Sequence, residues 1–243
     1  MPPTPSVARA ARERARAEVT REIVDAARRQ LATEGAPGVS LRAVARELGM
    51  VSSAVYRYVP SRDDLLTLLI IDAYDALGQA AEDAERSVER GDLSGRWLSI
   101  CHAVRGWALE HPHEYALVYG SPVPGYQAPQ DTVRAATRVT ALMTAILLDA
   151  VTVDPGRDEW RRAPSAEVAA AVGPTRPFVP EQVPSELLIR GLMAWTYLFG
   201  AVSFEVFGHR HQVIDDDPAL RRAFFTEEVA RIGALAGMAG DAG

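Results

Sequence analysis

The chain contains no lysine, and all 26 of its basic residues are arginine. A guanidinium group can bind a phosphate or a guanine edge through two parallel hydrogen bonds, which a lysine cannot do. Cysteine is almost as scarce, because Cys101 stands alone, and this excludes a disulfide bond within the chain. A chain without disulfides is typical of a reducing compartment, so we expect a cytoplasmic protein.

Long apolar segments are also scarce. The arginine-rich N-terminus leads into no apolar run, so we expect no signal peptide. The longest nearly apolar stretch, residues 192–204, is shorter than the ~20 residues that cross a bilayer, and we interpret it as part of a buried helix. Signals for β-hairpins and internal repeats are missing too. These absences favour an all-α protein, and its 243 residues are enough for one large or two modest domains.

Charge is distributed unevenly along the chain. The net charge of −6 by itself argues against binding to nucleic acid. Residues 1–60, however, hold ten arginines against six acidic residues, a net of +4, and the remainder carries −10. This asymmetry predicts a phosphate-facing N-terminal part attached to an acidic, soluble body.

The N-terminal part has the pattern of three short helices and the start of a longer one. The three are expected at residues 17–33, 41–48 and 52–58. Ser40 is a good N-cap for the second helix, and Gly49 suits the positive φ of a helix C-terminus. After Pro60, Ser61–Asp64 resembles a capping box that begins the fourth helix.

The rest of the chain is predicted to hold helices separated by glycine- and proline-rich loops. The expected helices cover residues 94–110, 112–119, 131–151, 185–208 and 218–236, with at most a short helix near 167–172 inside an irregular segment, 154–184.

Residues 41–58 match a helix-turn-helix, in which the second helix enters the major groove of DNA. Met50 and Val55 are apolar and would pin that helix to its neighbours. Its outer side would meet base edges, with Arg42 of the preceding helix reaching the groove or a phosphate. The residues expected at base edges are Arg42, Ser52, Ser53, Ala54, Tyr56 and Arg57. Ser40, Tyr58 and Arg62 are expected to hold phosphates. A helical hairpin with solvated arginines is the alternative.

The same segment resembles the TetR-like family of transcriptional repressors. The resemblance covers about residues 17–66 and is carried by Ile23, Ala26, Ala27, Gly35, Ser40, Leu41, Val44, Ala45, Leu48, Gly49, Met50, Ser52, Val55, Tyr56, Tyr58, Ser61, Arg62 and Leu65. Leu31 stands where an aromatic is usual, and Arg62 where a lysine is usual. The resemblance supports the same base-edge and phosphate roles, and Arg57 could serve in either.

The resemblance implies a homodimer on a palindromic operator and an effector pocket in the larger domain. We therefore expect an N-terminal arm at 1–16, a helix-turn-helix domain at 17–62 and a ligand-binding and dimerisation domain at 63–243. Residues 107–126 resemble the effector-domain segment of a subgroup called the WHG type. No specific ligand follows from that segment.

Aromatic residues of the second domain suggest a pocket for a small apolar or aromatic ligand. The expected lining is Trp107, Tyr115, Tyr119, Met143, Trp195 and Phe199. Each of them could instead serve only to pack the core, because aromatic side chains dominate cores.

A seam pattern of alternating steps of four and three runs along residues 185–208. We expect the homodimer interface to contain Leu188, Leu192, Val202 and Val206, together with Phe225, Val229 and Ile232 of the last helix. A purely internal core helix is the alternative.

Catalytic and metal sites are not indicated. The pairs His111–His113 and His209–His211 lack the i, i+4 spacing of a zinc protease, and residues 120–125 lack the Gly-x-Ser-x-Gly spacing of a hydrolase. We expect no enzyme, no cofactor and no metal. The expected function is a transcriptional repressor released by a ligand. A ligand-independent DNA-binding or architectural protein is the second reading, and a structural adaptor is the third.

Overall fold

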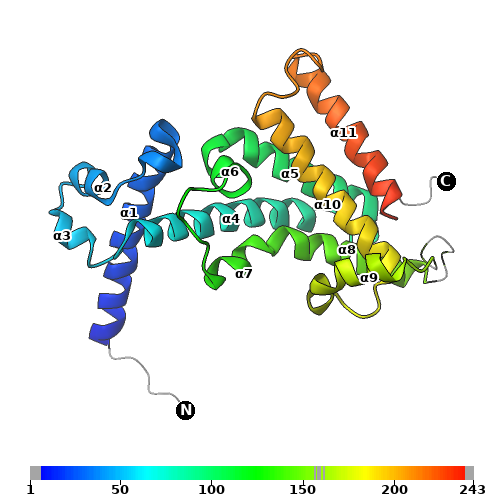
Figure 1. The fold of residues 1–243 in the computed structure, drawn as a ribbon, viewed down its shortest axis with the longest axis horizontal. Helices are drawn as coiled ribbons and strands as arrows, with labels where there is room; N and C mark the ends of the chain where they lie inside the picture. Colours follow the sequence, from blue (N-terminus) through cyan, green and yellow to red (C-terminus); the bar gives the residue numbers. More distant parts are fainter. Residues whose placement is uncertain (1–6, 156, 158–159, 161, 239–243) are drawn as a thin grey trace. The chain divides into compact units, whose positions relative to one another are not determined.

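The computed structural model describes residues 7–155, 157, 160 and 162–238, and these contain helices and no β-strand. The all-α prediction is confirmed. The first four helices are α1 (Val7–Gly38), α2 (Leu41–Glu47), α3 (Ser52–Val55) and α4 (Arg62–Arg86). The remaining elements are α5 (Leu93–Glu110), α6 (Pro112–Tyr119), η1 (Gln130–Thr132), α7 (Val133–Ala136), α8 (Arg138–Val153), α9 (Ala166–Val172), η3 (Gly173–Phe178), α10 (Ser185–Val206) and α11 (Pro218–Leu235) (Figure 1).

The structure corrects the expected start of the first helix, because α1 begins at Val7 rather than near residue 17. The added turns are rich in alanine and arginine, which favour helix without any apolar periodicity. The flexible-arm prediction for residues 1–6 lies outside the described residues. At its other end α1 is broken at Gly35, whose φ of 68° is the left-handed conformation that glycine adopts without strain.

Other predicted boundaries also shift. The helix expected at 131–151 is divided at Thr137: η1 and α7 precede this residue, and α8 begins after it. Within the irregular segment, α9 lies where a short helix was expected, and the 3₁₀ turn η3 follows it. The third predicted helix is shorter than expected, since α3 ends at Val55 and residues 56–58 form turns.

The chain packs into two compact units. Unit 1 contains the described residues of Met1–Tyr74 and His111–Ala135, and unit 2 those of Asp75–Glu110 and Ala136–Gly243. The long helix α4 begins in unit 1 and ends in unit 2. The predicted end of the DNA-binding domain at residue 62 stays a prediction. The packing unit extends further, because α6 and the start of α4 also belong to unit 1.

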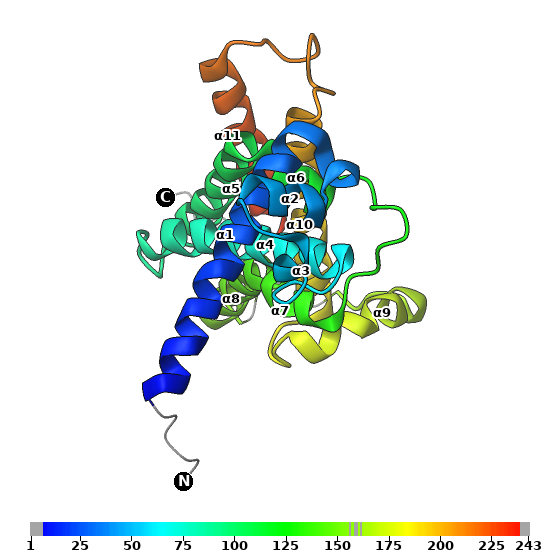
Figure 2. The same ribbon diagram turned by 90° about the vertical axis from the view of Figure 1, so that its left-hand side faces the viewer.

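The core of unit 1 joins α1, α2, α3 and the start of α4. Ile23, Val44, Val55 and Leu65 are fully buried in this cluster, and Leu117 of α6 packs against it. Figure 2 shows α2 and α3 on the same side of α1. The apolar stripe of α1 therefore holds the two short helices, which could not form stably alone.

The core of unit 2 lies among α5, α8, α10 and α11. Trp97 is buried there, and its indole N–H donates to the carbonyl of Val229 at 2.7 Å. Buried guanidiniums are paired: Arg96 contacts Glu85 and Asp149, and Arg105 contacts Glu205. Among the described residues, α10 is long and apolar enough to cross a bilayer by length and composition, a property that core helices share.

Candidate functional site

The turn between α2 and α3 presents α3 at the surface of unit 1. Gly49 has a φ of 65°, and the N–H of Met50 donates to the carbonyl of Ala45 at 2.8 Å, which ends α2 and reverses the chain. Val55 is fully buried and fixes α3 to the core. The neighbouring side chains of α3 consequently face outward.

The side chains expected at base edges are accessible. Ser52, Ser53, Arg57 and Arg42 are exposed, and Ala54 is half-buried. Tyr56 has 43% of its surface exposed although it is a large aromatic residue. Their exposure is compatible with contacts in the major groove, and their individual contacts to DNA stay predictions.

The expected phosphate residues differ in their surroundings. Ser40 occupies the N-cap position of α2, but its hydroxyl makes no capping hydrogen bond. Tyr58 is half-buried, and the guanidinium of Arg16 lies 5.4 Å from the centroid of its ring. Arg16 also donates to the carbonyl of Arg57 at 3.1 Å, a contact that sequence reasoning missed.

Arg62 makes hydrogen bonds within its own unit, and its expected phosphate role stays a prediction. Its Nη2 donates to the carbonyls of Ala36 and Pro37 at 2.7 and 3.3 Å. Its Nε donates to the carbonyl of Val39 at 3.1 Å. Carbonyls at the end of a helix have no partner within the helix, so a cation is favoured there. Arg62 thus fastens the beginning of α4 to the connection between α1 and α2.

The tyrosines expected in the pocket lie in unit 1. Tyr115 is fully buried, and its ring centroid is 5.1 Å from that of Tyr119. Tyr74 packs edge-on to Tyr119 at 5.9 Å, and its hydroxyl donates to the carbonyl of Val118. Burial raises the pKa of Tyr119 and of Tyr74. These tyrosines hold α6 against α4, and they do not line the cavity described next.

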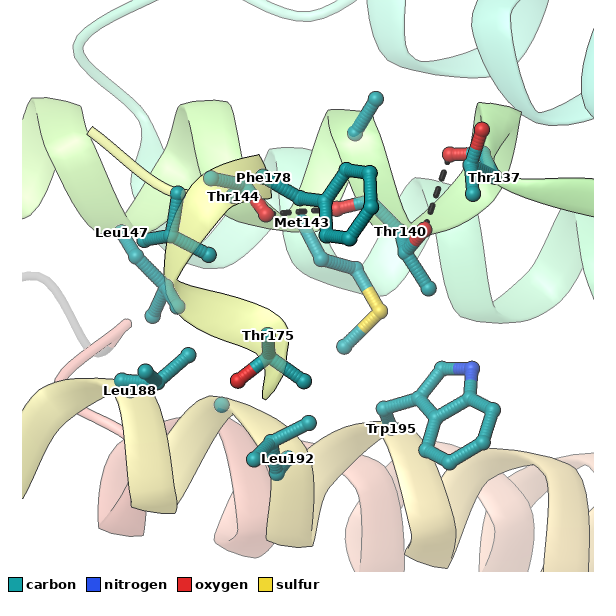
Figure 3. Close-up of a pocket in the computed structure, with 13 residues that line it drawn as sticks. Thr137, Thr140, Met143, Thr144, Leu147, Thr175, Phe178, Leu188, Leu192 and Trp195 are labelled. Carbon is teal, nitrogen blue, oxygen red and sulfur yellow. Dashed lines mark hydrogen bonds between the residues drawn. The ribbon is translucent and has the colours of Figure 1, made fainter. Parts of the chain in front are cut away.

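Unit 2 contains a cavity of about 420 Å³ bounded by α8, η3 and α10 (Figure 3). Its lining is Thr137, Thr140, Ala141, Met143, Thr144, Leu147, Thr175, Phe178, Val179, Leu188, Gly191, Leu192 and Trp195. Met143 and Trp195 were expected in a pocket and lie here. Trp107 and Phe199 were also expected, but they are buried elsewhere in unit 2.

The cavity wall is apolar with a line of hydroxyls. Thr140 and Thr144 donate their hydroxyl protons to the carbonyls of Thr137 and Thr140, each at 2.8 Å. Thr175 donates to the carbonyl of Val172 at 2.6 Å. A hydroxyl has one proton and two lone pairs, so these three groups retain acceptor capacity only. Among the described residues that line the cavity, none carries a charged side chain.

The expected dimer seam also requires a correction. Leu188, Val202, Phe225 and Val229 are buried within the single chain, so a partner subunit could not bury them further. The α10 helix is apolar on both sides, and Leu188 and Val202 of the expected seam face the core of their own chain. Leu192, Val206 and Ile232 are half-buried, and their interface role stays a prediction.

Among the described residues, no group of three or more His, Cys, Asp or Glu side chains could hold a metal ion. His102 packs against Phe225 and lies 3.1 Å from the hydroxyl of Thr226. Burial lowers the pKa of His102, and the neighbouring Arg222 and Arg105 lower it further.

Comparisons with known proteins agree with the exposed α3 and its supporting core. Residues 23–69 match the family described as bacterial regulatory proteins, tetR family, and residues 97–232 match the tetracyclin repressor-like C-terminal domain. The chain belongs to the TetR family. It is an HTH-type transcriptional regulator.

Relatives support this assignment over most of the chain. The HTH-type transcriptional regulator Rv1816 of Mycobacterium tuberculosis is 42% identical over 212 residues, covering 86% of this chain and 89% of the relative. The HTH-type transcriptional repressor DrrR1 of Streptomyces coeruleorubidus is 31% identical over 110 residues, which is 44% of this chain and 37% of that protein. The regulatory protein SCO4313, whose crystal structure is known, has a sequence 34% identical to this chain. The two structures align with a TM-score of 0.73 over 90% of this chain and 97% of the other.

The Arg62 contacts generate a prediction for stability. Arg62→Ala removes the donor to three carbonyls and should lower the free energy of unfolding by about 1–3 kcal/mol. Arg42→Ala is the matched control, because Arg42 is exposed on α2 and should change stability by less than about 0.5 kcal/mol. Urea unfolding without DNA measures both, and equal stability of the two variants would contradict the anchoring role.

Proposed function

We propose that this regulator is a repressor that binds a palindromic duplex operator as a homodimer and is released by an uncharged, mainly apolar ligand. The DNA-binding part of this proposal is supported by one observation: α3 exposes one side to solvent, while Val55 on its other side is buried in the core. TetR-family proteins are regulators rather than enzymes, and such a regulator acts in the cytoplasm, where the chromosome lies. The relative DrrR1 is itself named a repressor.

Exposed apolar side chains on α10 and α11 support the homodimer. Met193 and Phe204 lie eleven residues apart on one stripe of α10, and they are 52% and 57% exposed. Leu220, Phe224 and Leu235 form a corresponding exposed stripe on α11. Large apolar side chains exposed together on two helices are typical of an interface. We therefore move the proposed interface to the outer sides of α10 and α11.

The ligand class follows from the cavity wall. A charged ligand would lose its hydration without gaining an opposite charge, because the lining holds none. An apolar ligand with one N–H or O–H donor could bond to a threonine oxygen of α8 while its body packs on Met143 and Trp195. Figure 3 shows Met143 extending from α8 toward α10, where Trp195 lies.

Arg138 links this cavity to α4. It follows Thr137 at the start of α8, and it donates to Glu82 at 2.8 and 2.7 Å and to Asp75 at 3.0 Å, both on α4. These contacts raise the pKa of Arg138. A ligand that displaces the start of α8 would therefore displace α4 as well. Since Arg62 attaches α4 to the α1–α2 connection, the spacing of two recognition helices would change, and operator affinity would fall.

DNA recognition is tested with duplexes selected from fragments of the source genome. Arg42→Ala should weaken binding to the selected site by about 1–3 kcal/mol and relax the preference at one base pair. Arg86→Ala, an exposed arginine of unit 2, is the control and should leave the binding unchanged. If the unaltered protein binds all duplexes equally in a mobility-shift titration, the operator model fails and an architectural protein is favoured.

Dimerisation is tested by placing a charge on the exposed stripe of α10. Phe204→Glu should convert a dimer into a monomer at micromolar concentration, because an unpaired carboxylate would be buried in the interface. Leu109→Glu, at an exposed leucine of α5, should leave the dimer intact. Sedimentation velocity distinguishes these outcomes, and a monomeric unaltered protein would contradict the homodimer.

The ligand class is tested with two fluorescent probes that differ by one charge. N-Phenyl-1-naphthylamine is neutral with one N–H donor, and it should bind at micromolar concentration. The anilinonaphthalene sulfonate carries an added anionic group and should bind at least tenfold more weakly. Ala141→Trp should fill the cavity and abolish probe binding while preserving DNA binding, whereas Thr152→Trp, outside the lining on α8, should change neither. Equal affinity for both probes would contradict the proposed ligand class.

A further inference from the structure

The first turns of α1 are strongly basic. Residues 7–16 contain Arg9, Arg12, Arg14 and Arg16 against the acidic Glu13, a net charge of +3 over ten residues. Arg9 and Glu13 form an exposed pair at 2.9 Å. An exposed pair of this kind contributes little to stability, so a DNA phosphate can compete with Glu13 for Arg9.

Three of these arginines continue the core stripe of α1. Arg9, Arg12 and Arg16 follow one another at steps of three and four, which places them on one side of the helix. The next positions on that side are Val19 and then Ile23, and Ile23 is fully buried against the core of unit 1. The side of α1 that is apolar beneath α2 and α3 therefore becomes basic where that core ends.

Arg16 fixes this basic side next to the recognition helix. It donates to the carbonyl of Arg57 at 3.1 Å and lies over the ring of Tyr58. Arg57 and Tyr58 directly follow α3, and both are expected to face DNA. Figure 1 shows the first turns of α1 continuing beyond α3 toward the N-terminus.

We propose that Arg9 and Arg12 form a second DNA contact, to backbone phosphates flanking the bases that α3 reads. This inference rests on the proposed DNA-binding function. Arg9 precedes Arg16 by seven residues, or ~10 Å along the helix axis. Phosphates of one strand follow each other by ~3.4 Å along the duplex, so this length spans phosphates beyond the recognition helix.

A contact of this kind changes affinity without changing sequence preference. Phosphates are the same at every base pair, so guanidiniums that bind them position the protein but read no bases. Each neutralised phosphate also releases counterions, so the affinity falls more steeply as the salt concentration rises. The salt dependence therefore distinguishes Arg9 and Arg12 from a base-reading residue such as Arg42.

The test compares two double variants of the full chain. Arg9→Ala with Arg12→Ala removes the proposed contacts, and alanine preserves the helix. Arg86→Ala with Arg162→Ala removes the same charge from exposed positions of unit 2. Binding to a selected duplex and to an unrelated duplex is measured between about 50 and 200 mM salt, the range over which phosphate contacts dominate.

The Arg9/Arg12 variant should bind both duplexes at least tenfold more weakly than the unaltered chain, by the same factor. The slope of log affinity against log salt should fall by ~0.9 for each lost contact, or ~1.8 per subunit. The control variant should keep the unaltered slope, and circular dichroism should show equal helix content in all three proteins.

Three results would overturn the inference, and they are distinguishable. If the unaltered chain binds the selected duplex and the Arg9/Arg12 variant keeps its affinity and slope, the second contact is absent while the proposed function stands. If the unaltered chain binds no duplex even at the lowest salt, the proposed function and the inference both fail. A loss restricted to the selected duplex would also overturn the inference, because it would indicate base reading.

Discussion

Guanidinium groups bound to oxygen atoms hold α4 within each of the two units, and the stability of both units depends on these attachments. Arg62, the first residue of α4, donates to the carbonyls of Ala36 and Val39, at and just after the end of α1. Further along, Glu82 and Asp75 of α4 accept hydrogen bonds from Arg138 of α8. Hydrogen bonds in which at least one partner is charged are stronger than neutral ones, so both attachments are strong. Arg62 thus anchors the start of α4 within unit 1, and Arg138 anchors its later turns beside the cavity of unit 2.

The helix-turn-helix could be predicted from the sequence because its determinants are local. Gly49, the N-cap position of Ser40 and the buried Val55 specify a turn and a short helix within about twenty residues. The start of α1 was predicted wrongly for the opposite reason. Residues 7–16 have no apolar stripe to mark them, and their helical state follows from the composition and from Arg16 bonding to the distant Arg57.

The candidate site was less predictable because it depends on contacts between residues far apart in sequence. Arg62 bonds to carbonyls more than twenty residues away, and no spacing rule indicates which ones. Both sides of α10 are apolar, so its periodicity could not tell the core side from the exposed side. The threonines of the cavity resemble ordinary surface residues of a helix until α10 and η3 are placed opposite them.

Because the chain has no lysine, arginine alone carries the positive charge on the basic side of α1. Enzymes that acetylate ε-amino groups have no side-chain target anywhere in this protein, so that modification cannot switch off its attraction to a polyanion. Guanidiniums also stay protonated across the whole range in which cells live. Lysine acetylation therefore cannot lower the positive charge with which this regulator would meet DNA.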